Sequence, residues 1–385
     1  MGILDRELAL PDEVRALKNA AAAFVERRIL PHEVEIYRTG SVPEAIEQEM
    51  RDLGYYGLTT DAEYGGSGLS QLGFIAVHEE LCRAPKPVWK QVNVGSGFAA
   101  RVLKLFGTEQ QRKKYLPGIA GGTIQPAIAV TEPEAGSDVQ GLKTRAERIR
   151  HGWVLNGGKH YITYGARADL LFVLARSGSA AEKSKAFSVF LVEKGAPGLK
   201  VARLQETMGG RPLDQAELLF EDCEVAEDAL LGDEGRGLKY ILSMFAEERV
   251  TMGVSCLGTA RRAIELAIGH AHTRKTFGSH LSEYQALQHM LANCAIEYTA
   301  ARTMTYELAR QIDQRSATPA EAAMVKVFCA EMVNRVVDTA VQIFGGAGYM
   351  AESPICQMYR DVRVLRIAGG ASEIQRNLIA KELLR

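Results

Sequence analysis

The chain has 385 residues, 46% of them hydrophobic and 24% charged, and its formal net charge is −1. This composition is typical of a soluble globular protein with two or three subdomains, and it gives no electrostatic basis for binding nucleic acid or an anionic membrane. The six cysteines are scattered without a C-x-x-C pair, which excludes a disulfide framework or zinc site and predicts no metal. Charged residues near the N-terminus interrupt the apolar segment that a secretory signal peptide would need, and no long apolar run follows. We therefore expect a cytoplasmic protein without membrane insertion.

Residues 1–123 are predicted to form an N-terminal α-helical domain. Apolar residues recur at three- and four-residue steps in several segments, which we expect to be helices, at 14–24, 46–53, 72–81 and 99–106. Gly107 is placed to end one helix. Thr108 and Gln111 have the spacing of a capping box at the start of the next helix.

Residues 124–232 are predicted to form a central antiparallel β-domain. Short runs of β-favouring residues occur at 153–155, 159–163, 170–174, 187–192 and 216–220. The Asn156-Gly157-Gly158 segment between the first two runs is typical of a hairpin turn. Because no long helix separates the strands, an antiparallel sheet or small barrel fits better than a doubly wound sheet.

Residues 233–385 are predicted to form a C-terminal helical bundle. Long helical patterns cover 235–272, 281–312 and 318–344, and a last helix is expected after Gly370. Ser372 and Gln375 have capping-box spacing at its start. The expected fold is therefore α+β and multidomain, in the order helical, β, helical, with a four-helix bundle at the end.

One acid interrupts an apolar face of the first bundle helix. At 100° per residue, that face carries one apolar stripe, formed by Leu238, Ile241, Met244, Phe245, Met252 and Cys256. Glu248 lies in the middle of this stripe. Burial raises the pKa of a carboxylate toward the range of a general base. Periodicity alone leaves two interpretations open, a functional acid or a structural one in an ion pair or subunit contact.

Several common catalytic motifs are missing from the sequence. It contains no H-E-x-x-H, no G-x-S-x-G and no G-x-x-x-x-G-K-[ST]. The segment from Val130 to Asp138 places two hydroxyls and a turn glycine at the entry to the β region. Its free donors suit a flavin edge or a phosphate, although a polar turn has the same composition. The glycines of 345–348 are, by themselves, a helix stop.

The 130–138 segment resembles the V-T-E-P-x-A-G-S-D signature of the acyl-CoA dehydrogenase family. Further landmarks of that family follow over essentially the whole chain, at 158–163, 274–278, 342–349, 360–361 and 374–376. The resemblance implies the same three-domain fold, a non-covalent FAD, an acyl-CoA substrate, an electron-transferring flavoprotein as partner, and a homotetramer built as a dimer of dimers. It also implies a set of cofactor-binding positions: Ile128, Val130, Thr131, Gly136, Ser137, Tyr161, Ile162, Thr163, Arg274, Phe277, Gln285, Gln342, Ile343, Gly345 and Gly346.

The catalytic base implied by the resemblance is Glu248. Many family members carry the base in a loop before the last helix, where this chain has Gly369. The branch that includes isovaleryl-CoA and long-chain acyl-CoA dehydrogenases carries it in a Glu-Arg pair on the bundle helix, and Glu248-Arg249 matches that pair. Gly369 would keep the role of backbone donor to the thioester oxygen. The implied substrate-binding positions are Ser137, Arg249, Gly369 and Gly370.

The expected reaction is α,β-dehydrogenation of an acyl-CoA to the trans-2-enoyl-CoA. An enoyl-CoA reductase, as in crotonobetainyl-CoA reductase relatives, and an acyl-CoA oxidase remain alternatives on the same scaffold, and a non-catalytic binding member is a third. A carrier-protein thioester is also compatible with the sequence, which leaves acyl length and branching open. The residues that depart from the family pattern beside the flavin are Glu134, Tyr164, Ala371 and Glu373.

Overall fold

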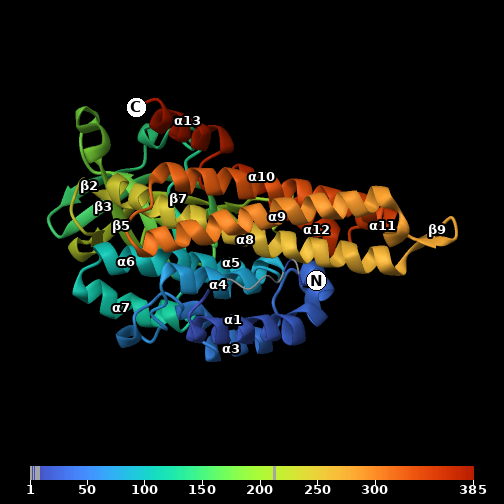
Figure 1. Cartoon of the computed structure of the whole chain (residues 1–385). Coiled ribbons are helices and arrows are strands. Elements are labelled where there is room, and N and C mark those ends of the chain that lie inside the picture. The colour runs from blue at the N-terminus through green and yellow to red at the C-terminus, as the bar shows by residue number, and fades with distance from the viewer. Residues whose placement is uncertain (1, 3, 5–8, 211–213) are drawn as a thin grey trace.

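The computed structural model describes residues 2, 4, 9–210 and 214–385. Most of the charged N-terminal segment considered above, residues 1, 3 and 5–8, lies outside the described part. Helices at both ends of the chain enclose one sheet (Figure 1), with the sheet at one end of a long helical bundle. The predicted α+β order of helical, β and helical parts is confirmed. No helix in the described ranges is long and apolar enough to cross a membrane.

The N-terminal part consists of short helices: α1 (Asp12–Phe24), α2 (Glu33–Thr39), α3 (Glu44–Asp52), α4 (Gln71–Leu81), α5 (Lys86–Val94), α6 (Ala100–Phe106) and α7 (Glu109–Ala120). The predicted capping box at Thr108 and Gln111 is formed, with both reciprocal hydrogen bonds. Helix α4 is buried on nearly all sides because it lies between α1 and the bundle. The apolar residues of α4 and α5 thus belong to the same core as the bundle helices.

The central part is an eight-stranded sheet in the order β6-β7-β3-β2-β4-β5-β8, with β1 beside β4. Its strands are β1 (Pro126–Ala129), β2 (Arg145–Ile149), β3 (Gly152–Thr163), β4 (Leu170–Arg176), β5 (Phe187–Glu193), β6 (Leu199–Leu204), β7 (Gln215–Ala226) and β8 (Leu230–Leu231). Most pairs are antiparallel, as predicted, whereas β1 and one residue of β2 pair with β4 in parallel. One face of the sheet packs against α6, α7 and the start of the bundle.

The hairpin turn predicted at Asn156-Gly157-Gly158 is wrong. These residues lie inside β3, which runs from Gly152 to Thr163 and bulges between Leu155 and Gly157. A Cβ at Gly157 would lie 2.6 Å from the Cα of Thr144, so glycine is needed for close backbone approach and for its φ of +144°. The tight turn instead joins β2 to β3 at residues 150 and 151.

The C-terminal part contains three long helices, α8 (Gly237–Thr273), α9 (Gln285–Asp313) and α10 (Pro319–Phe344). Shorter helices α11 (Gly346–Tyr349), α12 (Pro354–Val362) and α13 (Ser372–Leu383) follow, and α12 and α13 pack on α10. Between α8 and α9 a two-stranded ribbon, β9 (Lys275–Thr276) and β10 (Ser279–His280), projects from the bundle end farthest from the sheet (Figure 1).

The capping box predicted at Ser372 and Gln375 is not formed. Ala371 is the N-cap of α13, and no side chain caps this helix. Gln375 instead donates from its amide to the carbonyl oxygens of Gly369 and Gly370, at 2.9 and 3.3 Å. These bonds hold the preceding loop rather than the helix end.

Candidate active site

Glu248 lies on α8 where the helix passes from the sheet into the bundle. The neighbours predicted to share its stripe are buried, namely Leu238, Ile241, Met244, Met252 and Cys256, while the side chain of Phe245 is outside the described part. Glu248 itself is half-buried. The stripe thus places one carboxylate in an apolar interior, as the sequence predicted.

Burial raises the pKa of the Glu248 carboxyl, although three cations oppose this effect. They are Lys90 on α5, the adjacent Arg249 on α8 and Lys326 on α10. Desolvation outweighs them, so the carboxylate holds a proton more readily than an exposed glutamate does. That direction is the one needed by a base that must take a proton from carbon near neutral pH.

The loop before α13 lies directly beside Glu248. A Cβ built on Gly369 would be 4.0 Å from Oε1 of Glu248 and only 2.4 Å from Sδ of Met252. Gly369 has a φ of +64°, which disfavours any L side chain. Its N–H has no hydrogen-bond partner within the described ranges. The structure therefore combines a helix-borne acid with a loop that offers a backbone donor and no side chain.

Arg249 is buried and its guanidinium approaches the carbonyl oxygen of Pro319 at 3.5 Å. Together with Gly369 and Gly370, it lies at the junction of α8, α10 and the terminal loop. Ser137 is exposed on the β-domain loop. The predicted substrate residues thus come from the bundle, from the terminal loop and from the β-domain.

A buried ion pair stabilises the β-domain loop, residues 130–138. Nζ of Lys159, which has no exposed surface, lies 2.8 Å from Oε1 of Glu132 and 3.0 Å from the carbonyl oxygen of Val130. Glu132 also accepts the backbone N–H groups of Lys143 and Thr144. Burial raises the pKa of Glu132, but Lys159 and these donors outweigh it and the net shift is downward. The loop entering the sheet is therefore fixed at several points.

This loop and β3 form a surface that suits a flavin ring. The N–H and hydroxyl of Thr131 and the hydroxyl of Ser137 have no partner in the described part of the chain, so they are available to polar ring atoms. Tyr161 has a φ of +60° and is 61% exposed, so it is available to pack against a ligand. Ile128, Val130 and Thr163 are half-buried and Gly136 is exposed. Ile162 points into the sheet core, so only its backbone faces outward.

The remaining predicted cofactor residues lie at the other end of the bundle. Arg274 ends α8, Phe277 is 97% exposed at the tip of the ribbon, and Gln285 begins α9. Gln342, Gly345 and Gly346, at the end of α10, are also exposed at that end, whereas Ile343 is buried. The 26 residues of α8 from Glu248 to Arg274 span roughly 39 Å. Within one chain, the structure does not bring the two sets together.

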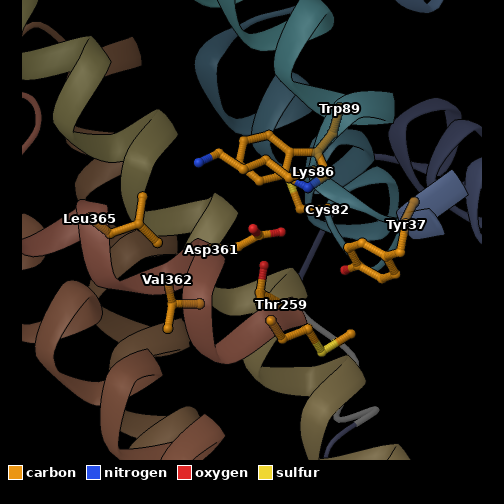
Figure 2. Close-up of a pocket in the computed structure, with 10 residues that line it drawn as sticks. Tyr37, Cys82, Lys86, Trp89, Thr259, Asp361, Val362 and Leu365 are labelled. Carbon is orange, nitrogen blue, oxygen red and sulfur yellow. The ribbon is translucent and has the colours of Figure 1, made fainter. Parts of the chain in front are cut away.

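A small cavity lies between the N-terminal helices and the bundle (Figure 2). Its lining includes residues of α2, α5, α8 and α12, and Figure 2 shows the Asp361 carboxylate between Lys86 and Thr259. Its volume of about 10 Å³ accommodates about one water molecule. The cavity therefore cannot hold an acyl chain.

Sequence reasoning missed Lys326 and Lys90. Lys326 is only 1% exposed and lies on the buried face of α10 with Ala322, Cys329 and Val333. The helical spacing that singled out Glu248 also places Lys326 on an apolar stripe. No comparable signal exists for Lys90, because α5 was not predicted as a helix.

Comparisons with family models, related sequences and solved structures give one consistent result. Models of the acyl-CoA dehydrogenase N-terminal, middle and C-terminal domains match residues 11–123, 127–223 and 235–384. The mitochondrial isovaleryl-CoA dehydrogenase of Pongo abelii is 33% identical over 97% of this chain and 89% of its own length. The solved butyryl-CoA dehydrogenase of Megasphaera elsdenii is 30% identical, covers 98% of this chain and 100% of its own, and has a TM-score of 0.93. A chain from the structure described as an electron transferring flavoprotein of Acidaminococcus fermentans is 33% identical over 98% of this chain and 100% of its own, with a TM-score of 0.94.

Proposed function

Since the chain belongs to the acyl-CoA dehydrogenase family, whose members are FAD-dependent oxidoreductases acting on CH–CH bonds, we propose that it converts an acyl-CoA to the trans-2-enoyl-CoA with Glu248 as the α-proton base. The observation that carries this proposal is that a Cβ built on Gly369 would lie 4.0 Å from Oε1 of Glu248. The loop position at which many family members carry the base is Gly369 in this chain. Glu248, on α8, lies beside that position.

The proposed chemistry divides between two groups of this chain. Glu248 removes the α-proton, and its raised pKa matches that task. The free Gly369 N–H donates to the thioester oxygen as negative charge develops there; one such donor contributes about 10²- to 10³-fold in rate. Thr131, Tyr161 and Thr163 would hold FAD, which would supply the acceptor for the β-hydrogen.

A basic groove at the start of α8 is a candidate site for the phosphate groups of CoA. It has a volume of about 460 Å³ and is lined by Lys185, Arg236 and Lys239 with the hydroxyls of Ser184 and Ser243. No ion pair joins these three cations to other residues in the described ranges, so they are available to phosphate groups. Lys239 precedes Glu248 by nine residues, roughly 14 Å along the helix and about half a turn around it, so CoA bound in the groove has to pass around α8 to bring its thioester to Glu248.

The division of the cofactor residues between the two ends of the bundle supports contact with a second copy of the chain. We propose that this contact belongs to a homotetramer arranged as a dimer of dimers. FAD cannot reach both Tyr161 and Arg274 of one chain across the length of α8. We propose that Arg274, Phe277, Gln285 and Gln342–Gly346 contact the FAD of a second copy. The exposed Phe277 and Tyr349 are then covered by that copy. Sedimentation velocity tests this arrangement, and a monomer that retains FAD would contradict it.

The experiment for the reaction is anaerobic titration of the holoenzyme with short, branched and long acyl-CoAs. Bleaching of the oxidised flavin band is expected with at least one of them, and failure with all of them would refute the reaction. Glu248→Gln should retain FAD and abolish both bleaching and exchange of the substrate α-proton in D₂O. A Glu248→Gln variant that reduces at the normal rate would remove Glu248 from the mechanism.

We further propose an electron-transferring flavoprotein as the acceptor of the electrons. Reoxidation by such a protein, measured against oxygen consumption, distinguishes a dehydrogenase from an oxidase. Net formation of acyl-CoA from enoyl-CoA under reducing conditions, without the forward reaction, would instead favour a reductase.

A further inference from the structure

Two buried polar side chains hold the loop that faces Glu248. Nζ of Lys326, on α10, lies 2.8 Å from the carbonyl oxygen of Gly370. The side-chain amide of Gln375, on α13, donates to the carbonyl oxygens of Gly369 and Gly370. Each of the two side chains is only 1% exposed. Two successive peptide groups of the loop are therefore tied to two different helices.

This arrangement is costly for the fold alone. Burying an ammonium group costs free energy unless it is paired, and Lys326 forms no ion pair within the part of the chain that the structure describes. The Gln375 Oε1 atom is also buried without a partner there. An apolar side chain at each of the two positions would avoid its own penalty, although the carbonyl oxygens of Gly369 and Gly370 would then lose their donors. The gain must come from what these groups hold.

What they hold is a Gly-Gly pair with almost no conformational preference of its own. Gly369 and Gly370 have φ values of +64° and +86°, and glycine adopts positive and negative φ about equally readily. These bonds fix the peptide planes 369–370 and 370–371. The Gly369 N–H belongs to the preceding plane, 368–369. That plane lies between plane 369–370 and the plane of the Ala368 N–H, which donates to the carbonyl oxygen of Val364 at 2.8 Å, so it is held from both sides. Without the bonds from Lys326 and Gln375, the 368–369 plane would be held only on its N-terminal side, and the Gly369 N–H could rotate about the flexible Gly369 backbone.

We propose that Lys326 and Gln375 are positioning residues that fix the Gly369 N–H in the direction of the substrate thioester oxygen beside Glu248. The inference rests on the proposed function, because only an acyl thioester gives that N–H its acceptor. Neither side chain has to touch the substrate. Their effect on the reaction passes through the loop.

Lys326 also acts on Glu248 through its charge. The ionisable groups that face Lys326 are Cys256, Arg249 and Glu248 on α8 and Glu373 on α13. Burial lowers the pKa of Lys326 to about 8, so it is mostly cationic at neutral pH and lowers the pKa of Glu248. Gln375 carries no charge, which allows the two effects to be separated.

Three variants separate the hydrogen bonds from the charge. Lys326→Met removes both, Lys326→Arg keeps a cation with donors, and Gln375→Leu removes hydrogen bonds alone. Lys86→Met serves as the control for loss of a lysine from the interior, since Lys86 makes no hydrogen bond to the loop. For each holoenzyme we would measure kcat and KM against pH and α-proton exchange in D₂O. Amide hydrogen exchange of residues 367–371 would be followed by mass spectrometry.

Lys326→Met and Gln375→Leu should each lower kcat and α-proton exchange about 10- to 100-fold, the cost of a misplaced catalytic donor. KM should change little, and the loop amides should exchange faster. Lys326→Arg should keep most of the kcat that Lys326→Met loses. Only Lys326→Met should shift the acid limb of the pH profile to higher pH, because loss of its charge raises the pKa of Glu248.

The proposal is overturned if Gln375→Leu has normal kcat and normal loop exchange, even when Lys326→Met shifts the pH profile. If Lys326→Met does not fold, Gln375→Leu and Lys326→Arg decide the question alone. If no acyl-CoA reduces the flavin of the wild-type enzyme, the proposed function is refuted instead. The amide exchange of the loop would still report whether these side chains hold it.

Discussion

Adding a single methyl group at Gly369 tests how the structure excludes a side chain from the terminal loop. In Gly369→Ala, two separate costs are expected. A residue with a Cβ at φ +64° costs about 1–2 kcal/mol, and moving the Met252 thioether, 2.4 Å from the new carbon, costs about 1–3 kcal/mol as overpacking. The variant should therefore lose about 2–5 kcal/mol of stability, by the sum of these two ranges.

Met252→Ala separates the two costs. In that background the steric cost is removed, so Gly369→Ala should cost only the backbone share of about 1–2 kcal/mol. Urea unfolding of the four holoenzymes in a double-mutant cycle gives the coupling energy. We expect a coupling of about 1–3 kcal/mol. Equal costs of Gly369→Ala in both backgrounds would show that Met252 does not limit this position.

The same geometry predicts that the acid cannot simply be moved to the loop. Gly369→Glu in a Glu248→Gln background should not restore α-proton exchange, because Met252 occupies the space of the new side chain. Adding Met252→Ala should allow partial recovery. Full recovery without the Met252 change would refute the steric argument, and FAD content provides the control for folding.

Three further changes test other parts of the site. Lys90→Met removes a cation that favours ionised Glu248, so the pKa of Glu248 should rise and the acid limb of α-proton exchange should move to higher pH; a shift to lower pH would contradict this sign. Lys159→Met leaves Glu132 buried without its counterion, so urea unfolding should show a loss of about 3–5 kcal/mol in stability and titrations should show weaker FAD binding. An unchanged FAD affinity would show that the Lys159–Glu132 pair does not support the loop that binds the flavin. Phe277→Ser should weaken assembly and FAD retention in sedimentation without lowering the stability of the helical bundle; tetramers that persist at low concentration would show that the ribbon is not an interface.

Most of the helices that the sequence predicted have one buried face, and α4, which is buried on nearly all sides, is the exception. The stripes of α1, α3 and the three long bundle helices have the period of 3.6 because each helix is covered on one side. Helix α5 was missed because it leads into residues 95–99, which are buried on all sides and show no period. The hairpin at Gly157 was wrong because a glycine inside a long bulged strand and a glycine in a turn have the same local sequence.

The site was predictable only in part, for a related reason. Glu248 was visible because a charge on an apolar stripe is conspicuous, and its neighbour Met252 was visible as part of the stripe. Contacts between residues that are far apart in the sequence leave no comparable pattern in it. The approach of Gly369 to Glu248 joins residues 121 positions apart in the sequence, and the bond from Lys326 to Gly370 depends on how α10 meets the loop. Only the packing of α8, α10 and α13 determines these contacts.

Separating the acid from the backbone donor changes what each part of the site must do. A loop that carries both must place a side chain and an N–H together, whereas here α8 holds the carboxylate rigidly and the loop needs only to orient one peptide group. A Gly-Gly loop meets that requirement without filling the space beside Met252, but glycine alone cannot hold a direction. The cost of burying Lys326 and Gln375 follows from this choice of residues. We therefore expect a substitution that stiffens the loop at Ala368, whose side chain is exposed, to reduce the dependence of kcat on Gln375.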